Sequence, residues 1–286
     1  MRKTVSGALC ALFGILVWAP ARAFEINLKP PASPIAEQIY GLHIMVLWVC
    51  LGIFIVVFGA MLYAIVNHRK SVGHKPALFH ENLALEVVWT IIPFVILAGM
   101  AYPATRTVLA MKNTADSALS IEVTGYQWKW QYSYLPYGIS FFSTLSTPPA
   151  QLADMAPKNR HYLEQVDHPM VVPTGEKIRL LVTSADVVHS WFVPALGVKQ
   201  DAFPGFIKAT WFEVDAPGVY RGFCTELCGK GHAFMPVVVQ AVTPAQFAAW
   251  VAAEQREKKT AATPAARAQA SRGHRTLTAP RAARAA

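Results

Sequence analysis

The sequence of 286 residues predicts two N-terminal transmembrane helices, then an all-β sandwich or barrel, and finally a disordered basic tail. Three observations predict this order: two long uncharged stretches, a central region that alternates apolar and polar residues, and an end rich in Ala and Arg. Hydrophobic residues make up 53% of the chain and charged residues only 15%, against an average of about 25% charged. This composition disfavours a disordered or nucleic-acid-coating protein and favours a chain that lies partly in a membrane.

The positive charge of the chain lies at its two ends. Residues 1–23 carry three basic residues and no acid, and the segment from Lys258 onward carries seven and no acid. Residues 113–257 hold 10 Lys and Arg against 13 Asp and Glu. The folded part is therefore mildly acidic, which excludes a general anion-binding surface and suits a basic partner.

Residues 1–23 have the pattern of a secretory signal peptide. Arg2 and Lys3 precede an apolar run, and Ala21-Arg22-Ala23 forms a small-x-small cleavage site. The alternative is an uncleaved anchor helix, although the run is short for a span. After cleavage the exported N-terminal segment would be residues 24–39.

Residues 40–67 and 83–107 are predicted to be transmembrane helices. Tyr40–Val66 and Val87–Thr105 contain no Asp, Glu, Lys or Arg, and a bilayer core needs about 20 such residues. A buried helix of a soluble protein is the alternative for each. The short loop at 68–82 contains His68-Arg69-Lys70, and basic loops stay on the cytoplasmic side. Both ends of the hairpin are therefore predicted to lie outside, as the signal peptide also requires.

Residues 108–258 are predicted to form the exported β-domain. Strands are expected where polar and apolar residues alternate or β-formers cluster near Gly and Pro: at 119–124, 177–182, 217–223 and 236–242. Residues 139–170 contain Pro148-Pro149 and no clear period, so a long loop is expected there. Thr243, Pro244 and Gln246 predict a capped helix start. Residues 259–286 are predicted to be disordered.

The chemistry is concentrated in the motif C-x3-C-x3-H-x2-M, formed by Cys224, Cys228, His232 and Met235. The motif brings together two thiolates, an imidazole and a thioether, of which the thiolates and the thioether are soft ligands that suit copper. A further ligand should come from an earlier strand. His189 is the best candidate, because we expect it at the end of the strand that starts at Lys177.

Three other interpretations compete for this motif. An exported cysteine pair can form a disulfide, which would leave His232 and Met235 unexplained. A structural zinc site with two Cys and two His would leave Met235 idle. A single blue copper needs one Cys, two His and a weak Met, so the second Cys would be surplus. Two bridging thiolates therefore favour two metal ions.

With this motif, the upstream His189-Ser190-Trp191 and the order of signal, hairpin and β-domain, the chain resembles subunit II of the haem–copper cytochrome c oxidases. The resemblance implies a cupredoxin-like Greek-key sandwich or barrel and a dinuclear copper centre called CuA. It assigns the copper ligands as the bridging Cys224 and Cys228, the imidazoles of His189 and His232, the weak thioether of Met235 and the backbone carbonyl of Glu226. In the family, the carboxylate of that Glu also binds a magnesium ion shared with subunit I.

The resemblance also assigns roles outside the copper motif. In Gly125–Tyr132, Trp128 matches the surface tryptophan that accepts electrons from cytochrome c, whereas Trp130 is expected to be an ordinary core residue. Glu86 lies at the cytoplasmic mouth of the second span, where the family has the entrance of a proton path; the alternative is a headgroup-level charge without a task. Candidate docking acids for cytochrome c are Asp186, Glu164 and Asp167, although a loop carboxylate is usually only solvated.

The function implied by the resemblance is that of the electron-accepting subunit of a respiratory cytochrome c oxidase. Such a subunit takes electrons singly from cytochrome c and passes them to haem in subunit I, where oxygen is reduced and protons are pumped. The chain would then be an electron-transfer module of a proton-translocating oxidoreductase. Its implied partners are subunits I and III, cytochrome c and membrane lipid, with no nucleic acid. Its location would be a bacterial inner membrane, with the cupredoxin domain in the periplasm.

Two other functions are compatible with a hairpin and a cupredoxin domain. A quinol oxidase subunit II has this architecture but lacks the copper ligands, all of which are present here. A membrane-tethered copper-delivery protein would give Trp128 and Glu86 no task. Nitrous oxide reductases carry a similar copper motif without this N-terminal hairpin. The copper content of the exported domain would separate the two-copper function from the others.

Overall fold

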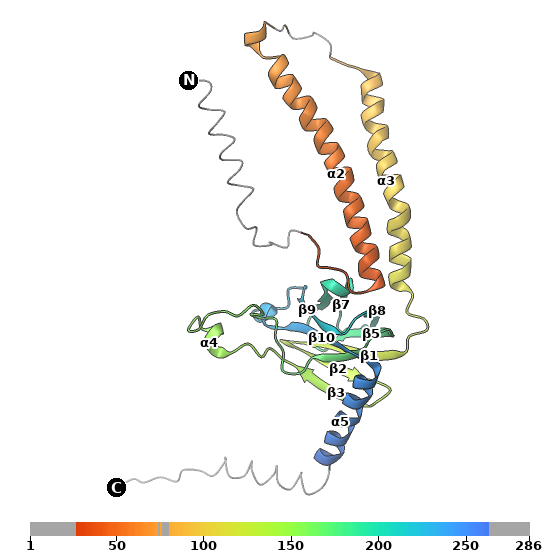
Figure 1. Ribbon diagram of the computed structural model, residues 1–286, viewed down its shortest axis with the longest axis vertical. Helices are drawn as coiled ribbons and strands as arrows, with labels where there is room; N and C mark the ends of the chain where they lie inside the picture. Colours follow the sequence, from red (N-terminus) through yellow and green to blue (C-terminus); the bar gives the residue numbers. More distant parts are fainter. Residues whose placement is uncertain (1–26, 74, 76–79, 263–286) are drawn as a thin grey trace, which may run out of the picture. The chain divides into compact units, whose positions relative to one another are not determined.

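The computed structural model describes residues 27–262 except 74 and 76–79 (Figure 1). The predicted signal peptide and the part of the predicted tail beyond residue 262 lie outside the described residues. The helices are α2 (Pro34–Asn67), α3 (Leu83–Lys112), α4 (Pro149–Leu152) and α5 (Pro244–Ala262), with single 3-10 turns η1 (Lys70–Val72), η2 (Pro194–Leu196) and η3 (His232–Phe234). The strands are β1 (Leu119–Tyr126), β2 (Lys129–Tyr134), β3 (Ile139–Ser143), β4 (Met170–Pro173), β5 (Lys177–Ser184), β6 (His189–Val193), β7 (Val198–Ala202), β8 (Lys208–Glu213), β9 (Gly218–Cys224) and β10 (Pro236–Val242).

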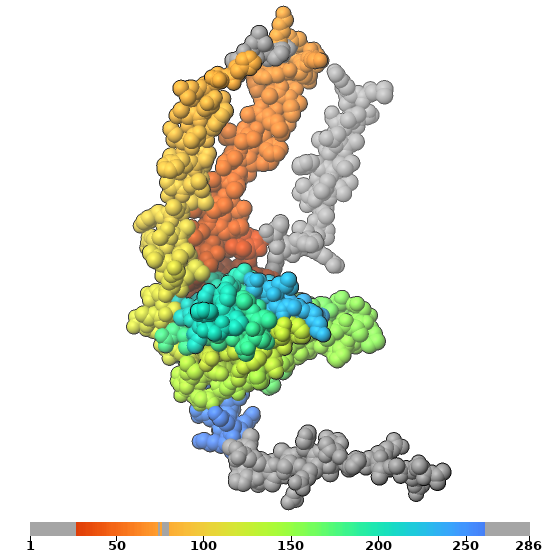
Figure 2. All heavy atoms as spheres, turned by 180° about the vertical axis from the view of Figure 1, so that it is seen from behind, coloured from red at the N-terminus to blue at the C-terminus, as the bar shows by residue number. Residues whose placement is uncertain are grey.

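Helices α2 and α3 run side by side (Figures 1 and 2). Their apolar side chains are exposed along most of their length. Their most apolar windows have mean hydropathies of 2.8 and 2.2, and none of the residues in those windows is buried. In the part of the chain that the structure describes, these two helices are long and apolar enough to cross a membrane. An exposed apolar surface of this extent suits lipid or other membrane helices.

Both helices are longer than the uncharged stretches predict. Helix α2 begins at Pro34 rather than at residue 40, because Ser33 caps it by accepting a hydrogen bond from the Ala36 amide at 3.0 Å. Helix α3 ends at Lys112 rather than at residue 107. The predicted bounds were based on the uncharged residues that a bilayer can accommodate. A helix can continue beyond the bilayer for as long as its backbone hydrogen bonds are made.

The β-domain is a sandwich of two five-stranded sheets, in the orders β3-β2-β1-β5-β8 and β4-β10-β9-β6-β7. Most neighbouring strands are antiparallel, but β1 pairs with β5 and β4 pairs with β10 in parallel. Strand β1 alternates buried and partly exposed residues, as the sequence pattern predicts. Large side chains from both sheets, including Trp130, Trp191 and Phe212, are fully buried between them. This core holds β6, which carries His189, and β9, which carries Cys224, in fixed register.

Two expectations about the β-domain were wrong. Residues 139–170 are not one long loop, because β3 pairs with β2 and the short helix α4 follows it. His189 does not end the strand that starts at Lys177: β5 stops at Ser184, and His189 begins β6 in the opposite sheet. The second error is not visible in a local pattern, because the chain crosses from one sheet to the other between residues 184 and 189.

The helix predicted after Thr243 is present, and its capping box is formed. The Thr243 amide donates to Gln246 Oε1 at 3.1 Å, and the Gln246 amide donates to Thr243 Oγ1 at 3.3 Å. The apolar stripe of α5 packs on the sandwich, where Phe247 and Val251 are buried. Helix α5 continues to Ala262, so the four residues 259–262 are helical rather than disordered. The composition of the tail did not reveal that a capped helix can extend for another turn.

Hydrogen bonds, among them one from the Asp215 amide to the Ala32 carbonyl at 3.5 Å, join the helical hairpin to the β-domain. Ser33 Oγ donates to the Leu196 carbonyl at 2.7 Å, and the Ala32 amide donates to the Ala195 carbonyl at 2.8 Å. At the end of α3, Trp211 Nε1 donates to the Ala110 carbonyl at 2.9 Å. The Ala110 carbonyl also accepts from the Asn113 amide at 3.2 Å, so the Trp211 indole adds a second donor at the end of the helix.

Candidate metal centre

The motif residues converge at one end of the sandwich. Cys224 is the last residue of β9, Cys228 lies in the following loop, and Met235 immediately precedes β10. His189 is brought beside them because β6 pairs with β9, where Trp191 is opposite Cys224. The Thr225 amide donates to the Ser190 carbonyl at 3.1 Å, which ties the start of the loop to β6. The sheet therefore positions ligands that are 35 residues apart in sequence.

The donor atoms of these residues lie within a few ångströms of one another. The Cys224 and Cys228 sulfurs are free thiols 3.9 Å apart. His189 Nδ1 lies 4.0 Å from Cys224 Sγ, and His232 Nδ1 lies 3.6 Å from Cys228 Sγ. Met235 Sδ lies 3.5 Å from Cys228 Sγ, and the Glu226 carbonyl lies 3.4 Å from Cys224 Sγ. Each of the other four predicted ligand groups therefore lies within 4.0 Å of one of the two sulfur atoms.

The centre is shielded from water. His189 is fully buried, and Cys224, Cys228 and Met235 expose at most 3% of their surface. His232 is partly exposed and lies on the solvent side of the cluster. Buried sulfur atoms next to an imidazole are a set of soft donors held without competing water, which is the environment that favours copper.

Asp186 fixes the orientation of the His189 ring. Its carboxylate accepts from His189 Nε2 at 2.8 Å, from the Gln127 amide at 2.7 Å and from the Val187 amide at 2.6 Å. With its proton on Nε2, the imidazole presents the lone pair of Nδ1 to the sulfur atoms. This carboxylate–histidine pair is the arrangement found behind many metal-ligating histidines.

The two thiols differ in their pKa values. Burial opposes ionisation of Cys224, but its contact with His189 and a backbone hydrogen bond from Ser190 lower the pKa of this thiol to about 7. Burial and the neighbouring Cys224 charge raise the pKa of Cys228 to about 12. A metal ion that binds both sulfurs must therefore displace a tightly held proton from the second thiol.

Trp128 lies directly over the loop that carries Cys228. Its indole Nε1 donates to the Cys228 carbonyl at 3.2 Å, and Gln127 Nε2 donates to the same carbonyl at 2.8 Å. The ring is partly exposed, in the turn between β1 and β2. A Cβ atom on Gly231 would lie 2.2 Å from Trp128 Cδ2, so only glycine leaves room for the ring there.

The neighbouring Trp130 is fully buried in the core, as expected for an ordinary packing residue, and its ring contacts His189 edge-on. Sequence reasoning did not assign a task to Gln127 or to Gly231. The position of Gln127 beside Trp128 was the available signal, but its contact with the cysteine loop spans 101 residues.

Comparisons with known proteins identify the family. The family model "Cytochrome C oxidase subunit II, periplasmic domain" matches residues 119–242, and "Cytochrome C oxidase subunit II, transmembrane domain" matches residues 21–106. The probable cytochrome c oxidase subunit 2 of Rickettsia bellii (strain RML369-C) is 35% identical over 82% of this chain and 85% of its own length. The cytochrome c oxidase subunit 2 of Cereibacter sphaeroides is 35% identical over 87% and 90%, respectively. The chain belongs to the cytochrome c oxidase subunit II family.

A solved structure is also similar. It is the periplasmic domain of subunit II of the cytochrome oxidase of Bradyrhizobium japonicum, 39% identical, with a TM-score of 0.45 over 50% of this chain and 98% of that one. Membership of the subunit II family confirms the predicted resemblance and the order of two apolar helices followed by a periplasmic cupredoxin-like domain. The cluster of His189, Cys224 and Cys228 is compatible with copper binding in a CuA-type domain.

The remaining predicted site residues of this subunit II lie apart from the cluster or beside it. Asp186 adjoins it, and its hydrogen bonds from three N–H groups and from the Ser184 hydroxyl leave the carboxylate less free for docking than the sequence implied. Asp167 accepts from the Thr144 amide and hydroxyl and from the His168 amide, and Glu164 lies 3.4 Å from His161. Glu86 is in the first turn of α3, partly exposed, after the capping residue Asn82.

Proposed function

We propose that this chain accepts electrons one at a time from cytochrome c and passes them to haem in subunit I of a respiratory cytochrome c oxidase, which reduces oxygen and pumps protons. The observation that carries this proposal is the convergence of two thiols, two imidazoles, a thioether and a carbonyl in a site whose sulfur atoms are buried. Cys224, Cys228, His189, His232, Met235 and the Glu226 carbonyl would together hold two copper ions. When bound, the copper pair supplies a one-electron redox centre.

The residues around the cluster have the task of keeping its geometry constant. Asp186 holds the His189 ring, the Ser190 carbonyl holds the loop, and Gln127 holds the Cys228 carbonyl. A ligand set that cannot relax undergoes little rearrangement when its charge changes by one electron. Burial of the sulfur atoms and the hydrogen bonds around them would set the potential.

Trp128 is proposed as the point at which electrons arrive. Its partly exposed ring can contact a protein in solution, and its hydrogen bond to the Cys228 carbonyl continues through one residue to a sulfur ligand. Asp186, Glu164 and Asp167 remain proposed docking acids for a basic cytochrome c. The net acidity of residues 113–257 supports steering of such a partner.

The topology proposed from the sequence places the β-domain in the periplasm and the loop at 68–82 in the cytoplasm of a bacterium. Residues 1–23 would be the signal peptide, and subunits I and III would pack on the exposed apolar faces of α2 and α3. Glu86 would then stand at the entrance of a proton path. The Glu226 side chain is exposed, so its carboxylate is accessible for the proposed magnesium ion shared with subunit I.

Copper analysis of the purified full chain tests the proposal. We expect two copper ions per chain and an electron paramagnetic resonance signal with hyperfine structure from two equivalent nuclei. Cys224→Ser should abolish that signal, whereas Cys50→Ser, which changes an exposed thiol on α2, should leave it unchanged. One copper ion per chain, or hyperfine structure from a single nucleus, would contradict the proposal.

Two further substitutions separate the proposed electron and proton roles. Trp128→Leu should slow reduction by cytochrome c while copper content stays constant. Glu86→Gln should reduce proton uptake by the assembled oxidase without slowing reduction of the copper centre. A normal reduction rate in the first variant, or normal turnover in the second, would remove the proposed role of that residue.

A further inference from the structure

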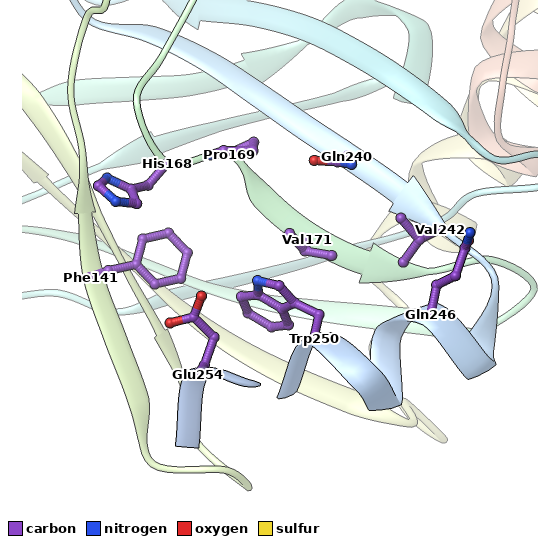
Figure 3. Close-up of a pocket in the computed structure, with 9 residues that line it drawn as sticks. All are labelled: Phe141, His168, Pro169, Val171, Gln240, Val242, Gln246, Trp250 and Glu254. Atoms are coloured by element: carbon purple, nitrogen blue, oxygen red, sulfur yellow. The ribbon is translucent and has the colours of Figure 1, made fainter. Parts of the chain in front are cut away.

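A cavity lies on the β-domain, outside the metal centre. It has a volume of about 410 Å³ and is formed where α5 crosses the edges of β3, β4 and β10. Figure 3 shows its walls, which are Phe141, His168, Pro169, Val171, Gln240, Val242, Gln246, Trp250 and Glu254. A volume of this size is within the range of small-molecule sites.

One end of the cavity combines aromatic rings with a carboxylate. The rings of Phe141 and Trp250 meet edge to face with centroids 6.3 Å apart, and the His168 ring lies 6.1 Å from that of Phe141. The Glu254 carboxylate lies beside these rings in Figure 3. Aromatic faces attract cations through their quadrupoles, and a nearby negative charge adds to that attraction.

No partner neutralises the Glu254 carboxylate among the described residues. Lys258 is four residues further along α5, where an ion pair would be expected. Its ammonium instead donates to the Gly138 carbonyl at 2.6 Å. The aromatic end of the cavity therefore carries negative charge that a bound cation would neutralise.

The other end of the cavity is polar but uncharged. Gln246 uses its Oε1 atom to accept hydrogen bonds from Thr243, which leaves the Nε2 group as a donor. Figure 3 shows Gln246 and Gln240 on the side of Trp250 away from Phe141 and His168. A ligand that spans the cavity would therefore place a cation at one end and an oxygen acceptor at the other.

A primary ammonium group would need several acceptors to replace its water, and Glu254 is the single carboxylate among the lining residues. A trimethylammonium group needs none, because its methyl groups can contact rings and the apolar walls formed by Pro169, Val171 and Val242. We propose that this cavity binds a trimethylammonium compound that carries an oxygen acceptor, either free choline or the phosphocholine group of a lipid.

Calorimetric titration of the full chain in nonionic detergent tests the proposal. Choline chloride should bind with a stoichiometry of one, and its neutral isostere 3,3-dimethylbutan-1-ol should bind at least about threefold more weakly. Glu254→Gln should weaken choline binding about two- to fivefold. Glu257→Gln is the matched control, since Glu257 is exposed on the same helix and does not line the cavity.

Phosphocholine in a parallel titration separates the two sources of the ligand. Tighter binding of phosphocholine assigns the site to a lipid headgroup, and tighter binding of choline assigns it to the free cation. Absence of saturable binding by both compounds would overturn the proposal. Equal affinity for choline and the isostere would mean that the cavity does not select a cation, and this result would reject the proposal. Equal effects of the Glu254 and Glu257 substitutions on choline binding would also reject it.

Discussion

The hydrogen bond between Asp186 and His189 predicts that Asp186→Asn weakens copper binding. The carboxylate accepts from three N–H donors, at 2.6 to 2.8 Å. An asparagine offers one carbonyl oxygen and turns an NH2 group toward the remaining donor. At least one of the three donors must then lose its partner, and the negative charge behind His189 disappears.

The size of the effect follows from the nature of this contact. A hydrogen bond to a charged group contributes about 1.5–3 kcal/mol, and loss of a partner behind a ligating histidine lowers metal affinity roughly 10- to 100-fold. The two ranges agree, because a tenfold change in affinity corresponds to about 1.4 kcal/mol. We therefore expect the copper affinity of Asp186→Asn to be roughly 10- to 100-fold lower than that of the wild type.

Competition with a copper chelator of known affinity measures this loss in the full chain. Asp167→Asn is the matched control, because Asp167 also accepts two backbone amides and one side-chain donor but does not contact a metal ligand. A copper affinity of Asp186→Asn equal to that of the wild type would refute the orienting role. Docking of cytochrome c would then be the remaining proposed task of Asp186.

Three further predictions follow from the described contacts. In Gly231→Ala, the new Cβ atom would lie 2.2 Å from the Trp128 ring, so the ring must move by more than about 1 Å. This variant should slow reduction by cytochrome c in stopped-flow measurements at unchanged copper content. Gly41→Ala, whose Cβ atom meets nothing within 4 Å, should not slow it, and equal rates for both variants would argue against the Trp128 path. Burial opposes ionisation of Asp167, but its hydrogen bonds from Thr144 and His168 hold the pKa below its usual range, so its stabilisation is present above the unfolded pKa of about 3.9 and disappears as the pH falls through the folded pKa. Asp167→Asn should therefore lower the melting temperature at pH 7 and converge with the wild type in strong acid; a constant difference at all pH values would contradict this. Ser33→Ala removes a buried helix cap that also donates to the Leu196 carbonyl, and it should lower the stability by about 1–2 kcal/mol, measured as a lower melting temperature of the β-domain. Asn82→Ala removes an exposed cap and should leave that melting temperature unchanged. An equal loss of stability in both variants would refute the anchoring role of Ser33.

The clustering of the proposed copper ligands was largely predictable because five of the six lie within twelve residues of sequence. The spacing of Cys224, Cys228, His232 and Met235 forces their side chains into one loop, whatever the rest of the fold does. Helix α2 and helix α3 were predictable for a similarly local reason, since apolar composition over one helix length is sufficient to define a span. In both cases the physical cause acts over a short stretch of chain.

The contacts that complete the site were not predictable in this way. Asp186 was recognised only by its distance in sequence from His189, and Gln127 had no expected task, yet both hold the ligands in place. The pairing of β6 with β9 decides that His189 faces the cysteines. A pattern of alternating residues identifies a strand but does not say which strand is its neighbour.

The sequence by itself determined the membrane hairpin, the β-rich character of residues 108–258 and the chemical identity of the metal-binding loop, because each depends on residues that are close along the chain. The tertiary structure alone decided that His189 begins a strand of the second sheet, that Asp186 orients its ring, and that Trp128 rests on the loop beside Gly231. These contacts join segments that the sequence separates by up to about a hundred residues, as Trp128 and Cys228 are. Only the packing of the two sheets brings such segments within hydrogen-bonding distance.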